Sequence, residues 1–87
     1  MAHIVPCPRP ALSEKLKAIN ASQLSIENTS KWMMFYKDDA SSVVAGWQDE
    51  FRLAPSERAL ALLYLASHTI QESKKKGGNT FSDAFSG

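Results

Sequence analysis

Cysteine is almost absent from this chain, which contains Cys7 and no other. A single cysteine cannot form an internal disulfide or a cysteine-based zinc site, and the simplest expectation is a reducing compartment. The sequence also lacks the glycine-rich loops that cradle phosphates and the paired motifs that bind catalytic metals. We therefore expect no cofactor and no metal.

An excess of one charge is also missing, because 10 basic residues face 9 acidic ones and the net charge is +1. So small a net charge gives no overall attraction to nucleic acid or to an anionic membrane, and a charged partner must be met by a local patch. No stretch is as apolar and long as a signal peptide or a membrane span. We expect an intracellular chain without direct contact to nucleic acid or membrane.

Strand patterns and repeats are absent, whereas apolar residues recur at helical spacing along most of the chain. Three of the first ten residues are prolines, which remove backbone donors and favour extended conformations. Residues 1–10 are therefore expected to be a disordered start, in which His3 and Cys7 are mobile and without function. Residues 11–87 are expected to form one helical domain. Its four helices and the start of a fifth are predicted near residues 11–20, 22–36, 38–54, 56–76 and 80–87.

Polar residues mark the ends of these helices. Ser22 and Ser56 are the predicted N-caps of the second and fourth helices, because a serine oxygen can accept a free N–H group of the first turn. Asp38 and Asp39 suit the start of the third helix as cap and as charge complement to the helix dipole. Lysines in a last turn followed by glycine predict that the fourth helix ends before Gly77.

The fourth helix contains the most apolar part of the sequence. Residues 59–66 are apolar around the whole helix, which indicates a central helix that is covered on most sides. Beyond this run, Glu72 is spaced for i,i+4 surface pairs with His68 and with Lys76. Trp32 and Trp47 lie on the apolar stripes of other helices and are expected in the core.

A hydrolase could be imagined from Ser67, His68 and Glu72. Successive residues on a helix point about 100° apart, so Ser67 cannot meet the neighbouring imidazole in the geometry of nucleophile and base. No catalytic residue is therefore assigned, and we expect a protein that is not an enzyme.

Several short stretches, taken in order, resemble a known family. They are Ser22-Gln23, Ser25-Ile26, Ser30-x-Trp32, Val43-Val44-x-x-Trp47-x-x-x-Phe51-Arg52, Leu62-Leu63-Tyr64-Leu65-Ala66 and Ile70-Gln71-x-Ser73-Lys74-Lys75-Lys76-Gly77. Together they resemble the CTD-interacting domain (CID), and they are most similar to the group found in regulators of nuclear pre-mRNA processing. The resemblance runs from about Leu12 to Phe85, and the last two stretches are its most specific part.

The resemblance implies an all-α fold, a right-handed α-superhelix of the VHS/ENTH type, truncated here to about four helices plus the start of a fifth. Such domains bind the heptad-repeat C-terminal tail of RNA polymerase II, usually phosphorylated on serine. The peptide lies in a groove between the second, fourth and seventh helices. The resemblance does not extend to the seventh helix, which carries the arginine that commonly pairs with serine phosphate.

The resemblance also implies which residues contact the peptide. They are Ser22, Gln23, Tyr64, Ser67, His68, Glu72 and Lys75. The family usually has Asn-Asp where this chain has Ser67 and His68, and that aspartate accepts a hydrogen bond from the peptide tyrosine. A neutral imidazole can still offer an acceptor nitrogen. Glu72 stands where asparagine is usual. From the residues alone, plainer roles stay open: capping for Ser22, core packing for Tyr64 and a solvated last turn for Lys75.

The implied function is a binding module for the polymerase tail, linked to transcription termination and pre-mRNA 3′-end processing in the nucleus. Two alternatives stay open. The chain could be a truncated or diverged helical scaffold fragment without a peptide site of its own, or an adaptor of the VHS type, because a shared fold does not fix the ligand.

Overall fold

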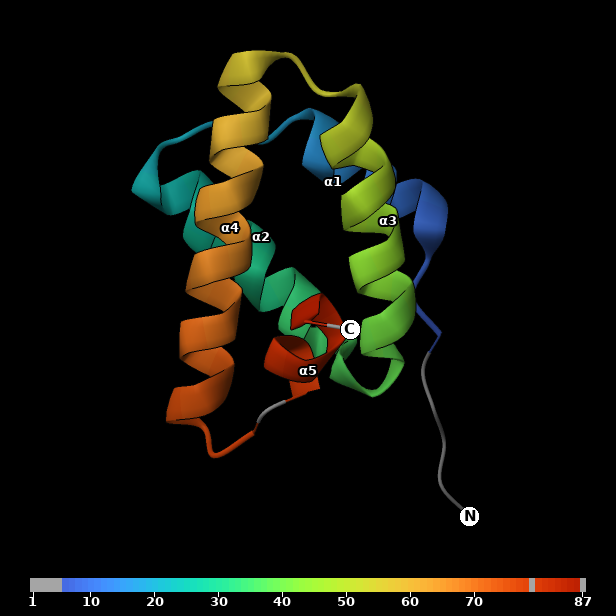
Figure 1. Ribbon diagram of the computed structural model, residues 1–87, viewed down its shortest axis with the longest axis vertical. Helices are drawn as coiled ribbons and strands as arrows, with labels where there is room; N and C mark the ends of the chain where they lie inside the picture. Colours follow the sequence, from blue (N-terminus) through green and yellow to red (C-terminus); the bar gives the residue numbers. More distant parts are fainter. Residues whose placement is uncertain (1–5, 79, 87) are drawn as a thin grey trace.

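The computed structural model describes residues 6–78 and 80–86, and within these ranges all of the regular structure is helical. The elements are α1 (Arg9–Lys17), α2 (Gln23–Phe35), the short 3-10 helix η1 (Lys37–Asp39), α3 (Ala40–Leu53), α4 (Ser56–Lys75) and α5 (Thr80–Ser86). The predicted all-α class is confirmed (Figure 1).

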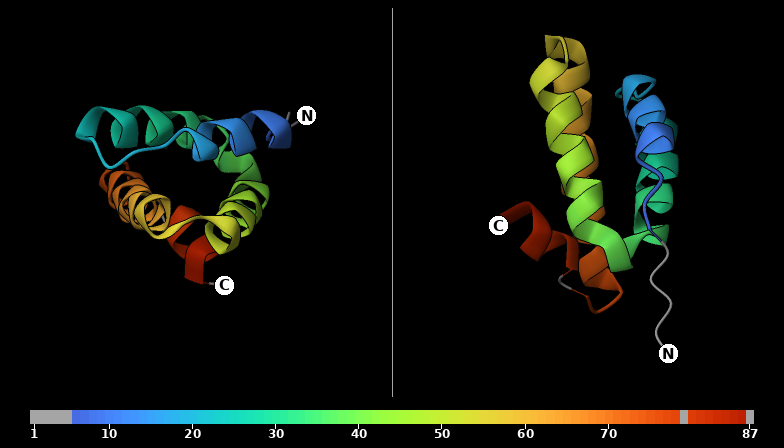
Figure 2. Two further views of the ribbon diagram at one scale, coloured as in Figure 1. Left: turned by 90° about the horizontal axis from the view of Figure 1, so that it is seen from above. Right: turned by 90° about the vertical axis from the view of Figure 1, so that its right-hand side faces the viewer.

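The helices form two layers. α1 and α2 lie in one layer, and α3 and α4 run antiparallel to each other in the second (Figures 1 and 2). Across the layers, α2 packs mainly against α4, and α1 packs against α3. The short α5 contacts both α3 and α4 in the lower half of Figure 1. This stacking of helix pairs is consistent with the predicted superhelix of four helices and a short fifth.

The core lies between the layers and receives apolar side chains from each α-helix. Its bulkiest enclosed apolar side chains are Leu12, Leu16, Met33, Val43, Leu62, Leu65 and Phe81. The ring of Trp47 stacks on Phe51 with 5.0 Å between centroids, and it meets the edge of Phe85 at 5.2 Å. Trp47 is therefore a core residue, as predicted. Trp32 is only partly buried, and the ammonium of Lys15 lies 5.3 Å from its ring centroid.

The two serines that were predicted as N-caps have different roles. Ser22 is the N-cap of α2, and its hydroxyl oxygen accepts the backbone N–H of Ser25 at 3.3 Å. The prediction for Ser56 is wrong, because Pro55 occupies the N-cap position of α4 and Ser56 is already helical. Pro55 provides the extended backbone before the first turn, with φ −65° and ψ 165°.

The predicted end of α4 is confirmed. The helix ends at Lys75, and Gly77 adopts a φ of 82°, a left-handed conformation that glycine takes without steric strain. The N–H groups of Gly77 and Gly78 then donate to the carbonyls of Lys74 and Ser73, each at 3.0 Å. This pair of bonds satisfies two carbonyls of the last turn and directs the chain toward α5.

The first helix is shifted relative to its predicted range. It begins at Arg9 and ends at Lys17, so the expectation that this proline-rich stretch is not helical is wrong at Arg9 and Pro10. Proline is tolerated in a first turn because its missing N–H would have no helical partner there. Ile19 is buried although it lies beyond the helix, so its apolar spacing reflects burial and not helix length.

The residues just before α1 are fastened to the start of α3. The N–H of Cys7 donates to the Asp39 carboxylate at 2.8 Å, and Cys7 is buried, contrary to the expectation that it is mobile. His3 lies outside the described residues. The Cys7 N–H, followed by the Ser42 hydroxyl and Arg9, lowers the pKa of Asp39, whereas burial is the main cause that raises the pKa of the Cys7 thiol. The Asp39 carboxylate therefore fastens the N-terminal segment and makes no capping bond to α3.

Candidate functional site

The candidate site lies on α4, which has two contrasting faces. The buried face is formed by Ala61, Leu62, Leu65, Ala66, Thr69 and Ser73. On the opposite face, Leu60, Leu63 and Tyr64 remain 47%, 49% and 52% exposed. The prediction that α4 is covered on most sides is therefore wrong for this second face. An apolar face that is open to solvent is typical of a surface that meets another molecule.

Two buried polar groups fix the rotation of α4 and so decide which face is exposed. The indole N–H of Trp47 donates to the carbonyl of Leu62 at 2.9 Å across the interface between α3 and α4. On the α2 side, the Thr69 hydroxyl donates to the carbonyl of Leu65 at 2.8 Å and lies 3.0 Å from the hydroxyl oxygen of Ser30. The bond from Thr69 to Leu65 lies within α4 and turns with it, but turning α4 about its axis would break the bond from Trp47 to Leu62 and separate Thr69 from Ser30. Buried polar groups are costly to leave unpaired.

The structure brings together the predicted contact residues of α4. Tyr64, Ser67, His68 and Lys75 lie on the side of the helix away from its buried face, because a turn of 100° per residue places all four within an arc of about 100°. Glu72 lies at the border of this side and is partly buried. Core packing was the plainer interpretation of Tyr64 from its sequence position. Its half-exposed ring shows that it is not a core residue.

Glu72 is the centre of the charges on this face. Its carboxylate lies 3.3 Å from the ammonium of Lys75 and 4.0 Å from Nε2 of His68. The predicted neighbourhood of His68 and Glu72 is thus found, whereas the basic partner of Glu72 is Lys75 and not Lys76. All three side chains are at least 31% exposed, so these contacts are weak and can be exchanged for contacts to a ligand.

Ser22 and Gln23 stand apart from this group. Both are exposed at the start of α2, where Ser22 caps the helix and the Gln23 amide donates to the Glu27 carboxylate at 3.3 Å. Among the described residues, no hydrogen bond or ion pair joins Ser22 or Gln23 to α4. α2 packs against α4 and crosses it at an angle (Figure 1), so these two residues begin a helix that contacts α4 but stand apart from the group on α4.

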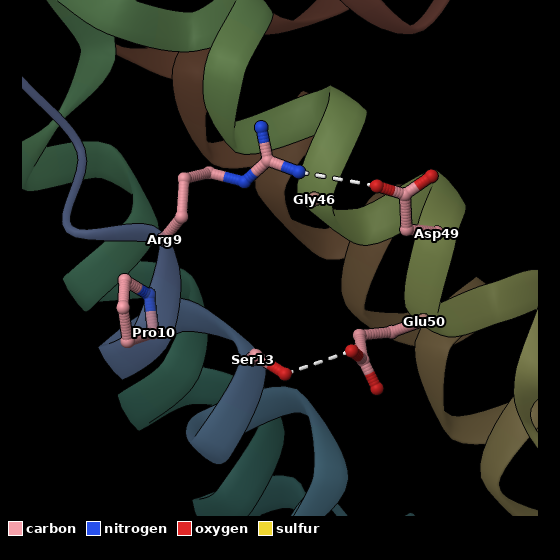
Figure 3. A pocket seen from close by; sticks show the side chains of 6 residues that line it. All are labelled: Arg9, Pro10, Ser13, Gly46, Asp49 and Glu50. Carbon is pink, nitrogen blue, oxygen red and sulfur yellow. Dashed lines mark hydrogen bonds and ion pairs between the residues drawn. The ribbon is translucent and has the colours of Figure 1, made fainter.

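A polar hollow of about 300 Å³ lies elsewhere, between α1 and α3 (Figure 3). Arg9 pairs with Asp49 at 3.1 Å, and the Ser13 hydroxyl donates to Oε2 of Glu50 at 2.8 Å. The other carboxylate oxygen of Glu50, Oε1, is buried and has no hydrogen-bond partner among the described residues. The helices approach closely at Gly46, where a Cβ atom would lie 2.5 Å from Leu12. We interpret this hollow as part of the packing interface between α1 and α3.

Comparison with known proteins identifies the family. The family model of the CID domain matches residues 10–87. This chain belongs to the CID family. CIDs are protein-interaction modules, and the recognition made from the sequence is confirmed.

Several relatives of this CID carry the same kind of name. The mouse and human proteins (Mus musculus and Homo sapiens) called Regulation of nuclear pre-mRNA domain-containing protein 1B are each 42% identical over 67 residues. The match covers 77% of this chain and 21% of each relative. The chicken protein (Gallus gallus) called Regulation of nuclear pre-mRNA domain-containing protein 1A is 39% identical, over 77% of this chain and 25% of its own length. The CID chain thus spans about a fifth to a quarter of these relatives.

Neither a membrane-spanning helix nor a metal-binding cluster is found in the described part of this CID. None of the helices in the described ranges is both long enough and apolar enough to cross a bilayer. Across residues 6–78 and 80–86, no group of three or more histidine, cysteine, aspartate or glutamate side chains could hold a metal ion.

Sequence reasoning missed Trp47 and Thr69 as the residues that orient the site. The signal for Trp47 was available, because a buried indole N–H needs an acceptor.

Proposed function

We propose that this chain is a binding module for the C-terminal tail of RNA polymerase II. The observation that supports this proposal is the exposed side of α4, where Tyr64, Ser67, His68 and Lys75 lie together beside open apolar surface. A tail peptide with tyrosine, serine and proline offers an aromatic ring, hydroxyl groups and phosphates. The exposed side of α4 offers matching apolar, acceptor and cationic groups.

The neutral part of the contact is proposed to centre on Tyr64 and His68. The half-exposed ring of Tyr64 gives an apolar platform for a proline or tyrosine ring, and its hydroxyl can form a hydrogen bond with the peptide. His68, one turn further, is partly buried, and its neutral imidazole has one nitrogen that can accept the hydrogen bond of a peptide tyrosine. This role replaces the aspartate that the family usually has.

The charged part of the contact is proposed to use Lys75. Its ammonium is now 3.3 Å from Glu72, but an exposed pair of this kind contributes only about 0–1 kcal/mol and is easily given up. A serine phosphate carries more charge than a carboxylate and would compete for the ammonium. Glu72 would repel the same phosphate, so the preference for a phosphorylated peptide should be modest.

The family and the relatives' names support the cellular setting of the proposal. CIDs are interaction modules, and the relatives are named for regulation of nuclear pre-mRNA. We propose that this chain acts in the nucleus and links the polymerase tail to termination and 3′-end processing. A fold of this type does not determine its ligand, so a binding experiment is needed to test whether this chain binds the polymerase tail.

The test is a titration of the 87-residue chain with a two-heptad peptide, unphosphorylated and phosphorylated on serine, followed by fluorescence anisotropy. We expect saturable but weak binding of at least one peptide, because Lys75 is the one cation on this side of α4 that we assign to the phosphate. A chain that unfolds cooperatively and binds neither peptide at roughly millimolar concentration, a free energy of about 4 kcal/mol, would favour the helical scaffold interpretation.

Two substitutions and one control variant locate the contact. Glu72→Gln should strengthen binding of the phosphorylated peptide by about two- to fivefold, because it removes a repulsive charge and frees Lys75. Glu57→Gln makes the same charge change in the exposed first turn of α4 and should have no such effect. His68→Asp restores the usual acceptor of the family and should strengthen binding of the unphosphorylated peptide. Equal effects of Glu72→Gln and Glu57→Gln would show that the phosphate lies elsewhere.

A further inference from the structure

The near-neutral charge of the chain conceals a local cluster of lysines in the lower half of the molecule in Figure 1. Here the end of α2, η1, the end of α4 and the start of α5 meet. A hollow of about 390 Å³ opens between the end of α2, η1 and the end of α4, and it is lined by Lys31, Met34, Phe35, Lys37 and Lys76. Among the described residues that line it, three are basic and none is acidic.

The aromatic floor of this hollow is exposed and held in place. Phe35 is 70% exposed, although it is one of the larger apolar side chains. The ring of Tyr36 meets it nearly edge-on, with 4.9 Å between centroids and 82° between planes. Tyr36 in turn packs on Trp32 at 4.8 Å. The Phe35 ring is therefore supported by one neighbour and remains open to a flat partner.

The three cations surround this ring from different elements. Lys31 lies one turn before Phe35 on α2, Lys37 follows in η1, and Lys76 comes from the end of α4. All three are exposed, and no ion pair involves any of them within the described part of the chain. Lysines act as strongly hydrated point charges, which suits successive phosphates of a strand better than the bidentate grip that arginine gives.

A second, smaller hollow of about 160 Å³ continues the surface. It shares Met34, Lys37 and Lys76 with the first and adds hydroxyl groups of Ser73 and Thr80 together with the carboxylate of Asp38. These oxygens can exchange hydrogen bonds with sugar hydroxyls or base edges. Two adjoining hollows with a cationic border form a path and not a single-ion site.

From this arrangement we propose that the surface of Lys31, Phe35, Lys37 and Lys76 binds single-stranded nucleic acid, with one base on Phe35 and phosphates at the three lysines. Exposed aromatics bordered by cations are the common way in which proteins hold single strands without reading sequence. A phosphorylated heptad peptide also offers a tyrosine ring, but a nucleic-acid strand offers a base beside every phosphate, which suits an exposed ring bordered by three lysines. The expectation that no nucleic acid is contacted was based on net charge, which does not report how the lysines are distributed.

This surface is separate from the proposed tail site. Lys76 contributes to the hollow between α4 and the end of α2, whereas Tyr64, Ser67, His68 and Lys75 lie on the exposed side of α4. The chain could therefore hold a polymerase tail and a nucleic-acid strand at the same time. Failure of one binding activity would not imply failure of the other.

The test is NMR titration of the 87-residue chain with a single-stranded RNA 10-mer of mixed sequence, and with its DNA counterpart. We expect amide shifts at residues 31–37 and 76–80, with a dissociation constant of about 10⁻⁴ M, typical of non-specific binding. About three phosphate contacts predict a slope of roughly −2 for log K against log salt. An absence of shifts with both strands up to about ten times that concentration would overturn the proposal.

Variants separate stacking from general charge. Phe35→Ala should weaken binding by at least about fivefold, the usual loss for one stacked base, and Phe35→Trp should preserve it. Lys37→Glu with Lys76→Glu should remove most of the salt dependence. The control is Lys17→Glu with Arg52→Glu, which makes the same charge change at exposed positions away from the hollow. Equal loss in both double variants, or displacement of the strand by a phosphorylated heptad peptide, would contradict the assignment.

Discussion

The two faces of α4 were built from similar residues and have different roles. Leu65 on the inner face is fully enclosed, whereas Leu63, two positions earlier, is half exposed. Both belong to the apolar run of residues 59–66, which predicts burial on every side. The difference shows that hydrophobicity determines that some face is buried. The buried hydrogen bonds between Trp47 and Leu62 and between Thr69 and Ser30 determine which one. The exposed face is thereby available for a partner.

The largest difference between the faces should appear in stability. Leu65→Ala removes an enclosed side chain and should lower the free energy of unfolding by about 2–5 kcal/mol. Leu63→Ala changes a half-exposed side chain, and its cost should stay near or below about 1 kcal/mol. Chemical unfolding followed by circular dichroism measures both. Similar losses in the two variants would mean that the faces are not distinguished as the structure has them.

The next effect concerns the group that orients α4. Trp47→Phe keeps an aromatic ring but removes the N–H that bonds the Leu62 carbonyl, and it should cost about 1–3 kcal/mol of unfolding free energy. Trp32→Phe is the matched change at a half-buried position and should cost less. The same unfolding experiment measures both, and a larger loss for Trp32→Phe would contradict the assigned role of Trp47.

On the exposed face of α4, a substitution should change the affinity for the peptide more than it changes the stability of the fold. Tyr64→Ala should leave the unfolding free energy within about 1 kcal/mol of the parent chain, because the ring is half exposed. It should weaken binding of the heptad peptide about tenfold, or about 1.4 kcal/mol, the loss of a modest aromatic contact. Leu53→Ala, at a position 76% exposed on α3, is the control. Peptide titration measures the affinity of both variants. An unchanged affinity of the Tyr64 variant would show that Tyr64 is not part of the binding site.

The smallest effect lies outside α4, at the N-terminal fastening. The pKa of Asp39 is lowered mainly by the Cys7 N–H, so its carboxylate stabilises the folded chain above the ordinary value of 3.8. This contribution is lost as the pH falls through the lowered pKa of the folded state. Asp39→Asn should therefore be less stable than the parent chain at neutral pH, and the gap should close in acid below about pH 3. A gap that persists in acid would mean that the carboxylate charge is not responsible.

The sequence predicted local features of the fold better than it predicted exposure. The capping by Ser22 and the stop at Gly77 depend on a few adjacent residues, and both are found. The burial of Cys7 and the shifted start of α1 depend on contacts with residues of η1 and α3 that lie more than 30 positions away. Such long-range contacts produce no periodic pattern in the sequence. Helix propensity alone also does not distinguish a proline in the first turn of a helix from a proline in a loop.

For the candidate site, the residues of α4 were predictable as a group but their surroundings were not. Helical spacing alone places Tyr64, Ser67, His68 and Lys75 on one side. Whether that side faces the core or solvent depends on where α2, α3 and α5 pack. The choice of Lys75 over Lys76 as the partner of Glu72 depends on side-chain geometry at the end of the helix.

The central claim is that the exposed side of α4 meets the polymerase tail. Its most direct test is amide shift mapping by NMR during titration with the two-heptad peptide. We expect saturable shifts that concentrate on residues 60–75 of α4 and at the start of α2, with Leu65 and the rest of the inner face little affected. Shifts confined to other surfaces, or an absence of shifts at millimolar peptide, would contradict it.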